Sequence, residues 1–296
     1  MQALTANEFF AREYRHVVFA GGGNRCWWQA GLVEQLAQHS CWQAVHLIGV
    51  SAGAGIATAF ATGRIRNALE AAVERFAVTP RNVEWSELLK GRRPFMLPRI
   101  YPDWIHSFLQ GEDLDKLKSG LRQIEVVITR PLRFLPPTLS TILALLLYST
   151  EKLWLKNLHG RLPHRLGFRA EYLDLRACPD LNAARTLLQA SAAAVPITPT
   201  HRVHGRPALD GGFYDSVPLP LDRAHDAHTL LLLTRHRPRL PQIFEHDHRV
   251  YIQPENAVPA VNMDCTSPGD VRRTFEQGRD EALRLLSGAG ERTPKL

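Results

Sequence analysis

Residues 49–53, Gly49-Val50-Ser51-Ala52-Gly53, have the residue types and spacing of a reactive serine site. A serine hydroxyl is a poor nucleophile unless it is exposed, held in place and adjacent to a base. Glycines two residues before and after the serine remove side chains that would clash in a tight turn, and they let a substrate approach the backbone. The motif therefore predicts nucleophilic attack by Ser51 on an acyl group.

The segments that flank this motif predict a strand, a sharp turn and a helix. Residues 44–48 are largely apolar and lead into the motif, and the small residues 54–60 follow it. A helix that begins directly after Ser51 turns its free N–H groups toward the serine, where an oxyanion would form during acyl transfer. This strand–turn–helix context is the one that the motif requires.

Two further glycine-containing motifs are present in the chain. A loop follows the apolar residues 16–20 and consists of Gly21, Gly22, Gly23, Asn24 and Arg25. Far downstream lies a motif of Asp210, Gly211 and Gly212. A dinucleotide-binding loop is the alternative for the first glycines, but the later glycine spacing and an acidic residue at the end of the second strand are missing.

The three motifs, in this order, resemble the patatin-like phospholipase family, which is marked by G-G-G-x-R/K, G-x-S-x-G and D-G-G or D-G-A. The resemblance covers most of residues 16–220 and includes residues 189–196 and 210–218. It implies that Ser51 is the nucleophile and that Asp210 takes its proton directly, without a histidine. A carboxylate can do this if partial burial raises its pKa toward neutrality. The expectation is a phospholipase A or lysophospholipase that acts on phospholipid or lysophospholipid through an acyl-enzyme, with no cofactor and no metal.

The glycine loop is expected to form the oxyanion hole. Backbone N–H groups of Gly22, Gly23 and Asn24 are the expected donors, assisted by that of Ala52, because amides next to glycine can point inward without side chains in the way. Arg25 is expected either to stabilise the loop or to attract an anionic phosphate. After Arg25 the family has a glycine and a small residue, whereas this chain has Cys26, Trp27 and Trp28. This departure bears on the size of the acyl pocket.

Two alternatives to the dyad follow from the residues. A carboxylesterase with a Ser-Asp-His triad could draw its base from the histidines that follow Asp210, which are His225, His228, His236, His246 and His248. Against it, the serine follows only the second strand, and most of these histidines stand among charged residues. The other alternative is a non-catalytic lipid-binding protein on the same fold, its site closed by Trp27 and Trp28.

The order of elements predicts an α/β fold. Strands at 16–20 and 44–50 alternate with helices at 26–38 and after Ser51, which favours a three-layer α/β/α arrangement with a mostly parallel central sheet. In the helix at 26–38 the polar residues, Gln29 among them, are assigned to the wet face. We expect a single patatin-like hydrolase domain over residues 1–296, with its core at about 16–220 and an inserted cap region at about 80–165.

Composition favours an anionic partner. The chain has 296 residues, 45% of them apolar, and a formal net charge of +7. Such a charge suits acidic lipid headgroups or nucleic acid, and because no nucleic-acid-binding motif is present, a lipid surface is preferred. Four cysteines without metal or redox spacing, an N-terminus without an apolar signal region and the lack of a spanning apolar run predict a cytoplasmic protein, peripheral on the inner membrane surface.

The segment at 138–148 is apolar nearly all round. It reads either as a buried core helix or as an interfacial cap helix that meets lipid. Basic residues flank it on both sides, namely Arg130, Arg133, Lys152 and Lys156. The interfacial reading predicts peripheral contact with anionic membranes.

Overall fold

A computed structural model of the protein describes residues 1–151, 157–160 and 162–290. Its strands are β1 (Gln2–Ala3), β2 (Tyr14–Phe19), β3 (Trp42–Val50), β4 (Gln123–Arg130), β5 (Arg169–Asp174), β6 (His201–Val203), β7 (Arg206–Asp210), β8 (Thr229–Leu232), β9 (Ile243–His246) and β10 (Arg249–Ile252). Its α-helices are α1 (Ala6–Phe10), α2 (Cys26–Leu36), α3 (Ala52–Ala61), α4 (Ile65–Ala77), α5 (Leu97–Phe108), α6 (Gly111–Ser119), α7 (Pro137–Ser149), α8 (Leu162–Arg165), α9 (Leu181–Ser191) and α10 (Pro268–Gly290). The fold is therefore of the predicted α/β class.

One sheet runs through the molecule in the order β1-β9-β10-β8-β2-β3-β4-β7-β6, and β5 also pairs with β4. The five central strands, from β10 to β4, are parallel to their neighbours. The strands outside them pair antiparallel. Short turns with positive φ join β6 to β7 and β9 to β10, at residues 204–205 and 247–248. Such short turns allow only antiparallel pairing of the strands that they join. The prediction of a parallel sheet therefore holds for the five central strands of a mixed sheet.

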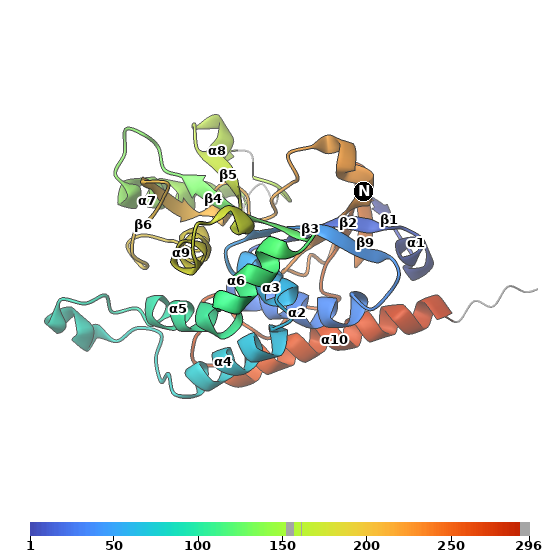
Figure 1. Ribbon diagram of the computed structural model, residues 1–296, viewed down its shortest axis with the longest axis horizontal. Coiled ribbons are helices and arrows are strands. Elements are labelled where there is room, and N and C mark those ends of the chain that lie inside the picture. The colour runs from blue at the N-terminus through green and yellow to red at the C-terminus, as the bar shows by residue number, and fades with distance from the viewer. Residues whose placement is uncertain (152–156, 161, 291–296) are drawn as a thin grey trace, which may run out of the picture.

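The two faces of the sheet are covered differently. Alternate residues of β2 point to opposite faces, Val17 and Phe19 to one core cluster and Val18 to another, so all three of these consecutive residues are apolar. The first face packs against helices, among which α2, α3, α4 and α10 lie below the sheet in Figure 1. The second face packs against irregular segments, including Leu158 and Val217.

The expected cap region at about 80–165 is not one continuous insertion. Its middle part is β4, which lies between β3 and β7 in the sheet. On the N-terminal side of β4 are the 3₁₀ helix η2 (Trp85–Lys90), α5 and α6, and on the C-terminal side are α7 and α8. Lys152 and Lys156, two of the predicted basic flanks, lie outside the described residues.

Gln29 corrects the assignment of one face of α2. The sequence pattern assigned Gln29 to the solvent-exposed face of the helix, but its side chain is fully buried. Its amide group donates to the carbonyl oxygens of Ala20, at 3.1 Å, and Leu232, at 2.7 Å. The reason is that α2 is covered on both sides, by the sheet and by α10. A Cβ on Gly31 would lie 1.9 Å from the carbonyl oxygen of Phe275, so α10 contacts α2 almost backbone to backbone.

Candidate active site

Ser51 stands at the sharp turn between β3 and α3, as the sequence predicts. It is the N-cap residue of α3, and its backbone has φ 55° and ψ −134°. The flanking glycines are required by packing: a Cβ on Gly49 would lie 2.4 Å from the Cα of Ala54, and one on Gly53 would lie 2.5 Å from the carbonyl oxygen of Phe19. A non-glycine residue with positive φ is strained by about 1–3 kcal/mol and persists where the surroundings impose it.

Asp210 lies beside the serine. The Ser51 hydroxyl donates to Oδ2 of Asp210 at 2.8 Å, and the N–H of Gly212 donates to Oδ1 at 2.7 Å. Burial raises the pKa of Asp210 to about 6, although the hydrogen bonds from Gly212 and Ser51 act in the opposite direction. Both carboxylate oxygens are thus occupied, one of them by the serine itself.

The order of strands explains how two residues so far apart in sequence meet. Ser51 follows β3, Asp210 ends β7, and β4 lies between these two strands. Gly211 makes the approach possible, because a Cβ there would lie 2.3 Å from the carbonyl oxygen of Val127 in β4. The Thr129 hydroxyl also donates to the carbonyl oxygen of Gly211 at 3.2 Å.

Ser191 is a positioning residue that sequence reasoning missed. At the end of α9 and fully buried, its hydroxyl accepts the N–H of Ser51 at 2.8 Å and donates to the carbonyl oxygen of Val127 at 2.6 Å. It therefore ties the turn at Ser51 to β4. Residues 189–196 carry part of the family pattern, but no local signal gives Ser191 this partner.

Two of the three backbone amides of the glycine loop that are expected to act as oxyanion donors have no protein acceptor among the described residues. Among the described residues, the N–H groups of Gly22 and Gly23 donate to no protein acceptor, and the same holds for Ala52 at the start of α3. The prediction for Asn24 is wrong, because its N–H donates to the carbonyl oxygen of Asn262 at 2.9 Å. Asn24 therefore anchors the loop and does not point an amide at the serine.

Close contacts keep the loop in place. The N–H of Gly21 donates to the carbonyl oxygen of Ser216 at 2.8 Å, and its own carbonyl accepts the Thr234 hydroxyl at 3.0 Å. A Cβ on Gly22 would lie 2.4 Å from Oγ1 of Thr234. Gly23 has φ +54°, and a Cβ there would lie 2.0 Å from the carbonyl oxygen of Asn262.

Arg25 ends the glycine loop and brings a half-buried positive charge close to the serine. Its Nε atom is buried and has no hydrogen-bond partner among the described residues. Burial and the charge of Arg235 lower the pKa of Arg25. Arg235 in turn donates to the hydroxyl of Tyr148, on α7, at 3.0 Å. Two guanidinium groups thus lie near the glycine loop, and no ion pair with a carboxylate is formed by either of them within the described residues.

A cavity of about 300 Å³ opens beside the serine and has a mainly apolar lining. Its walls include Ser51, Asp210, Trp27, Tyr101, Trp104 and Leu145. Trp27 packs edge-to-face against Trp104, with ring centroids 5.8 Å apart. Trp28 points away from the cavity, because it is fully buried and its indole N–H donates to Glu281 of α10 at 3.0 Å. The two tryptophans therefore leave the cavity open.

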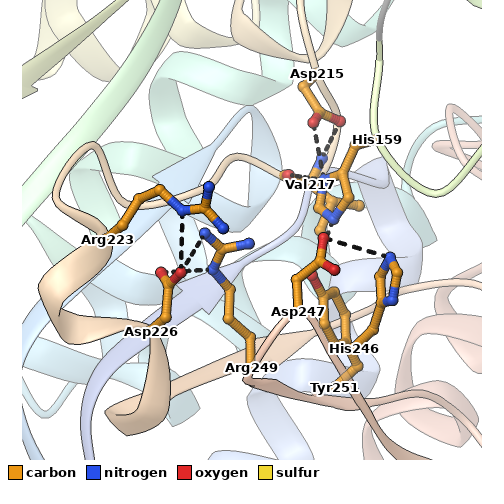
Figure 2. A network of polar contacts seen from close by, with 9 residues as sticks. All are labelled: His159, Asp215, Val217, Arg223, Asp226, His246, Asp247, Arg249 and Tyr251. Atoms are coloured by element: carbon orange, nitrogen blue, oxygen red, sulfur yellow. Dashed lines mark hydrogen bonds and ion pairs between the residues drawn. The ribbon is translucent and has the colours of Figure 1, made fainter. Parts of the chain in front are cut away.

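The histidines considered for a triad lie elsewhere. Figure 2 shows His246 in a polar network beside Tyr251, with Nε2 at 3.7 Å from Asp247. In the same network His159 contacts the Asp215 carboxylate and the Tyr251 hydroxyl, each at 3.0 Å. Among the described residues, His201 is the one histidine that borders the cavity, and it forms no hydrogen bond with Ser51 or Asp210.

Two features are absent from the part of the chain that the structure describes. No three histidine, cysteine, aspartate or glutamate side chains there are grouped as ligands for a metal ion. No helix within residues 1–151, 157–160 and 162–290 combines the length and the apolar content needed to cross a bilayer.

The site is thus that of an α/β protein with a serine and a carboxylate paired in the wall of an apolar cavity. The family model for patatin-like phospholipases matches residues 17–222, more than half of the chain. This chain belongs to that family, and membership supports a lipid acyl hydrolase in general.

Two solved structures are similar to the chain. VipD from Legionella pneumophila has 14% sequence identity and a TM-score of 0.46, over 94% of this chain and 67% of that one. The type III effector protein ExoU has 15% identity and a TM-score of 0.32, over 95% of this chain and 54% of that one. No curated protein matches the chain in sequence.

Proposed function

We propose that the protein is a serine acyl ester hydrolase of the phospholipase A or lysophospholipase type, with Ser51 and Asp210 as its catalytic dyad. The observation that carries this proposal is the 2.8 Å hydrogen bond from the Ser51 hydroxyl to the Asp210 carboxylate. A nucleophile in direct contact with a base needs no third residue to activate it. The family membership supplies the lipid substrate class.

The reaction has two steps. In the first, Asp210 takes the proton as Ser51 Oγ attacks the ester carbonyl, and the lipid alcohol leaves with that proton when the acyl-enzyme forms. In the second, Asp210 takes a proton from water, which attacks the acyl-enzyme, and the fatty acid leaves as Ser51 regains its proton. The N–H groups of Gly22, Gly23 and Ala52 hold the oxyanion in both steps.

A pKa of about 6 suits Asp210 to this work. At neutral pH most of the carboxylate is ionised and ready to accept the serine proton. An ordinary aspartate, with a pKa near 3.8, would be a weaker base and a poorer match to the proton it must return to the leaving group.

The substrate proposed is an ester with a long acyl chain and a phosphate. The apolar lining, with Trp27 and Trp104, suits the acyl chain. The guanidinium groups of Arg25 and Arg235 suit the phosphate of a phospholipid or lysophospholipid headgroup, because neither is neutralised by a carboxylate of the described residues.

Contact with a membrane is proposed through α7. Its buried side chains are small or polar, namely Ser140, Thr141 and Ala144. Four of its large apolar side chains, Leu139, Ile142, Leu145 and Leu146, are 42% to 62% exposed, whereas Leu143 and Leu147 pack against a core cluster. Four exposed large apolar side chains on one helix favour the interfacial reading. We place the contact at the inner, cytoplasmic surface of the membrane, in keeping with four cysteines that are all unpaired.

Labelling with a fluorophosphonate tests the function. The unaltered protein should be labelled at Ser51, and the Ser51→Ala variant should not be. Release of fatty acid from a lysophospholipid should be lost with Ser51→Ala and with Asp210→Asn. An unlabelled wild-type protein that still binds lipid would instead establish the non-catalytic alternative.

A further inference from the structure

Residues 79–96, called here the 79–96 loop, form a closed projection between α4 and α5. Its base is held by backbone hydrogen bonds from Glu84 to Pro94, at 2.7 Å, and from Met96 to Asn82, at 3.0 Å. Its tip is η2, which is followed by the cap residue Gly91 with φ 66°. In Figure 1 this turquoise segment projects at the left end of the molecule's long axis.

The tip of the loop is ordered by an ionic centre. The Glu87 carboxylate is buried under its own loop and pairs with Lys90 at 2.8 Å and with Arg99 at 2.6 Å. These two hydrogen bonds lower the pKa of Glu87. At the base of the loop Met96 packs against the main core, but the fold of the tip does not depend on the apolar side chains of η2.

Those apolar side chains point into solvent. Trp85 is 67% exposed, Leu88 53% and Leu89 93%. Side chains so exposed add little to folding, and three of them within one short turn mark a surface for interaction. Tryptophan is also the side chain that bilayer interfaces favour.

The charges around the tip identify the kind of surface that it fits. The loop and the first turn of α5 contain five cations, Arg81, Lys90, Arg92, Arg93 and Arg99, against two anions, Glu84 and Glu87. Apolar tips among excess cations complement a bilayer with anionic headgroups. A purely apolar protein partner would leave these charges without a counterpart.

The loop is also coupled to the cavity. It continues directly into α5, where Leu97, Ile100 and Tyr101 line the cavity wall. The Arg93 guanidinium donates to the carbonyl oxygen of Pro196 at 3.1 Å, next to the cavity residue Ile197. Helix α7 lies on the same, left side of the molecule in Figure 1.

We propose that the 79–96 loop is a second membrane-docking element, which inserts Trp85, Leu88 and Leu89 into the headgroup region of an anionic bilayer. The loop and α7 would then both contact the bilayer, with the cavity between them. The role of this docking rests on the proposed function, because docking would deliver lipid to Ser51. The docking itself can be measured without catalysis.

The test uses the full chain carrying Ser51→Ala, so that no lipid is consumed, and co-sedimentation with phosphatidylcholine vesicles with or without phosphatidylglycerol. Adding Leu88→Ser and Leu89→Ser should weaken binding to the anionic vesicles about tenfold or more, since two apolar side chains no longer leave water. The matched control is Leu121→Ser. Leu121 is 94% exposed but borders a separate cavity at the amino-terminal ends of β3 and β4, away from Ser51, so its change should leave binding unaltered.

A second pair of variants tests the charges and does not touch the apolar tip. Arg81→Gln with Arg92→Gln should reduce the preference for anionic over neutral vesicles about fivefold per charge at low salt. If the leucine variant fails to fold, this arginine pair tests the proposal instead: an unchanged preference for anionic vesicles would contradict it. Undiminished binding by a folded leucine variant, or an equal loss with Leu121→Ser, would overturn the proposal.

A readout with a soluble ester separates this inference from the proposed function. With Ser51 restored, the Leu88→Ser and Leu89→Ser variant should hydrolyse a short soluble ester at the unaltered rate and vesicle lipid more slowly. Absent hydrolysis of the soluble ester by the unaltered protein would contradict the proposed function but leave vesicle binding, and with it the docking loop, standing.

Discussion

At the scale of single residues, the hydrogen bond between Ser51 and Asp210 sets the expected dependence of activity on pH. The base must be ionised, and burial raises the pKa of Asp210 to about 6. For a short soluble ester, kcat/KM should therefore be level above pH 7 and fall about tenfold per unit below pH 6. A series of initial rates across pH measures this.

The same series of rates, repeated on histidine variants, distinguishes a Ser-Asp dyad from a Ser-Asp-His triad. Replacing any single histidine by glutamine should leave both the profile and the plateau nearly unchanged. A histidine whose removal costs about 10⁴-fold, as in a disabled triad, would replace Asp210 as the immediate base.

At the scale of elements, the glycine loop should tolerate almost no added side chain. Gly23→Ala would place a Cβ 2.0 Å from the carbonyl oxygen of Asn262, so the loop must shift and its amides must turn away from the oxyanion. We expect turnover to fall about 10²-fold, the usual cost of one donor. Gly63→Ala is the matched control: its φ is +71°, but nothing lies within 4 Å of the new Cβ. Equal activity of both variants would remove the loop from the site.

The polarity of α7 gives a second prediction at this scale. Ile142→Ser with Leu146→Ser should weaken binding to anionic vesicles about tenfold and leave the melting temperature unchanged, because both side chains are exposed. Ala144→Ser, on the fully buried side of the same helix, should lower the melting temperature instead. Leu145 is left unaltered because it lines the cavity. If the double variant unfolds, α7 is a core helix.

The sequence predicted those elements whose signals are local. The turn at Ser51, the strand that precedes it and the paired glycine motifs all follow from nearby residues and their packing limits. The burial of Gln29, the anchoring of Asn24 by Asn262 and the contact between Ser191 and Ser51 depend on segments far away in the chain. The antiparallel strands at the edges of the sheet were missed for the same reason, since the hydrophobic pattern of one strand does not identify the strand with which it pairs.

At the scale of the whole molecule, the end opposite the serine should be sensitive to acid. His16 lies there with Nδ1 at 3.1 Å from Nδ1 of His46, stacked on His225, while His46 lies 3.2 Å from Glu125. Burial, followed by the charges of His225, His46 and His228, lowers the pKa of His16 to about 4, and Asp222 acts in the opposite direction.

The sign of this effect follows from proton binding. The unfolded chain takes up a proton at His16 near pH 6.5, whereas the folded chain does so only near pH 4. The contribution to stability is therefore complete above pH 6.5 and is lost as the pH falls toward 4, by about 3 kcal/mol. Urea unfolding of wild type and His16→Asn at several pH values should show a smaller acid loss for the variant. Parallel curves would exclude this role of His16.

The position of α7 at one end of the molecule, beside the cavity, has a consequence for how rates depend on substrate. An enzyme that binds a bilayer through an apolar face encounters substrate molecules in the plane of that bilayer and not those dissolved in the surrounding solution. Its turnover should follow the mole fraction of substrate in the vesicle. Adding a non-hydrolysable ether lipid, with the total amount of substrate held constant, should slow hydrolysis in proportion to that dilution, whereas a short soluble ester should be hydrolysed at an unchanged rate.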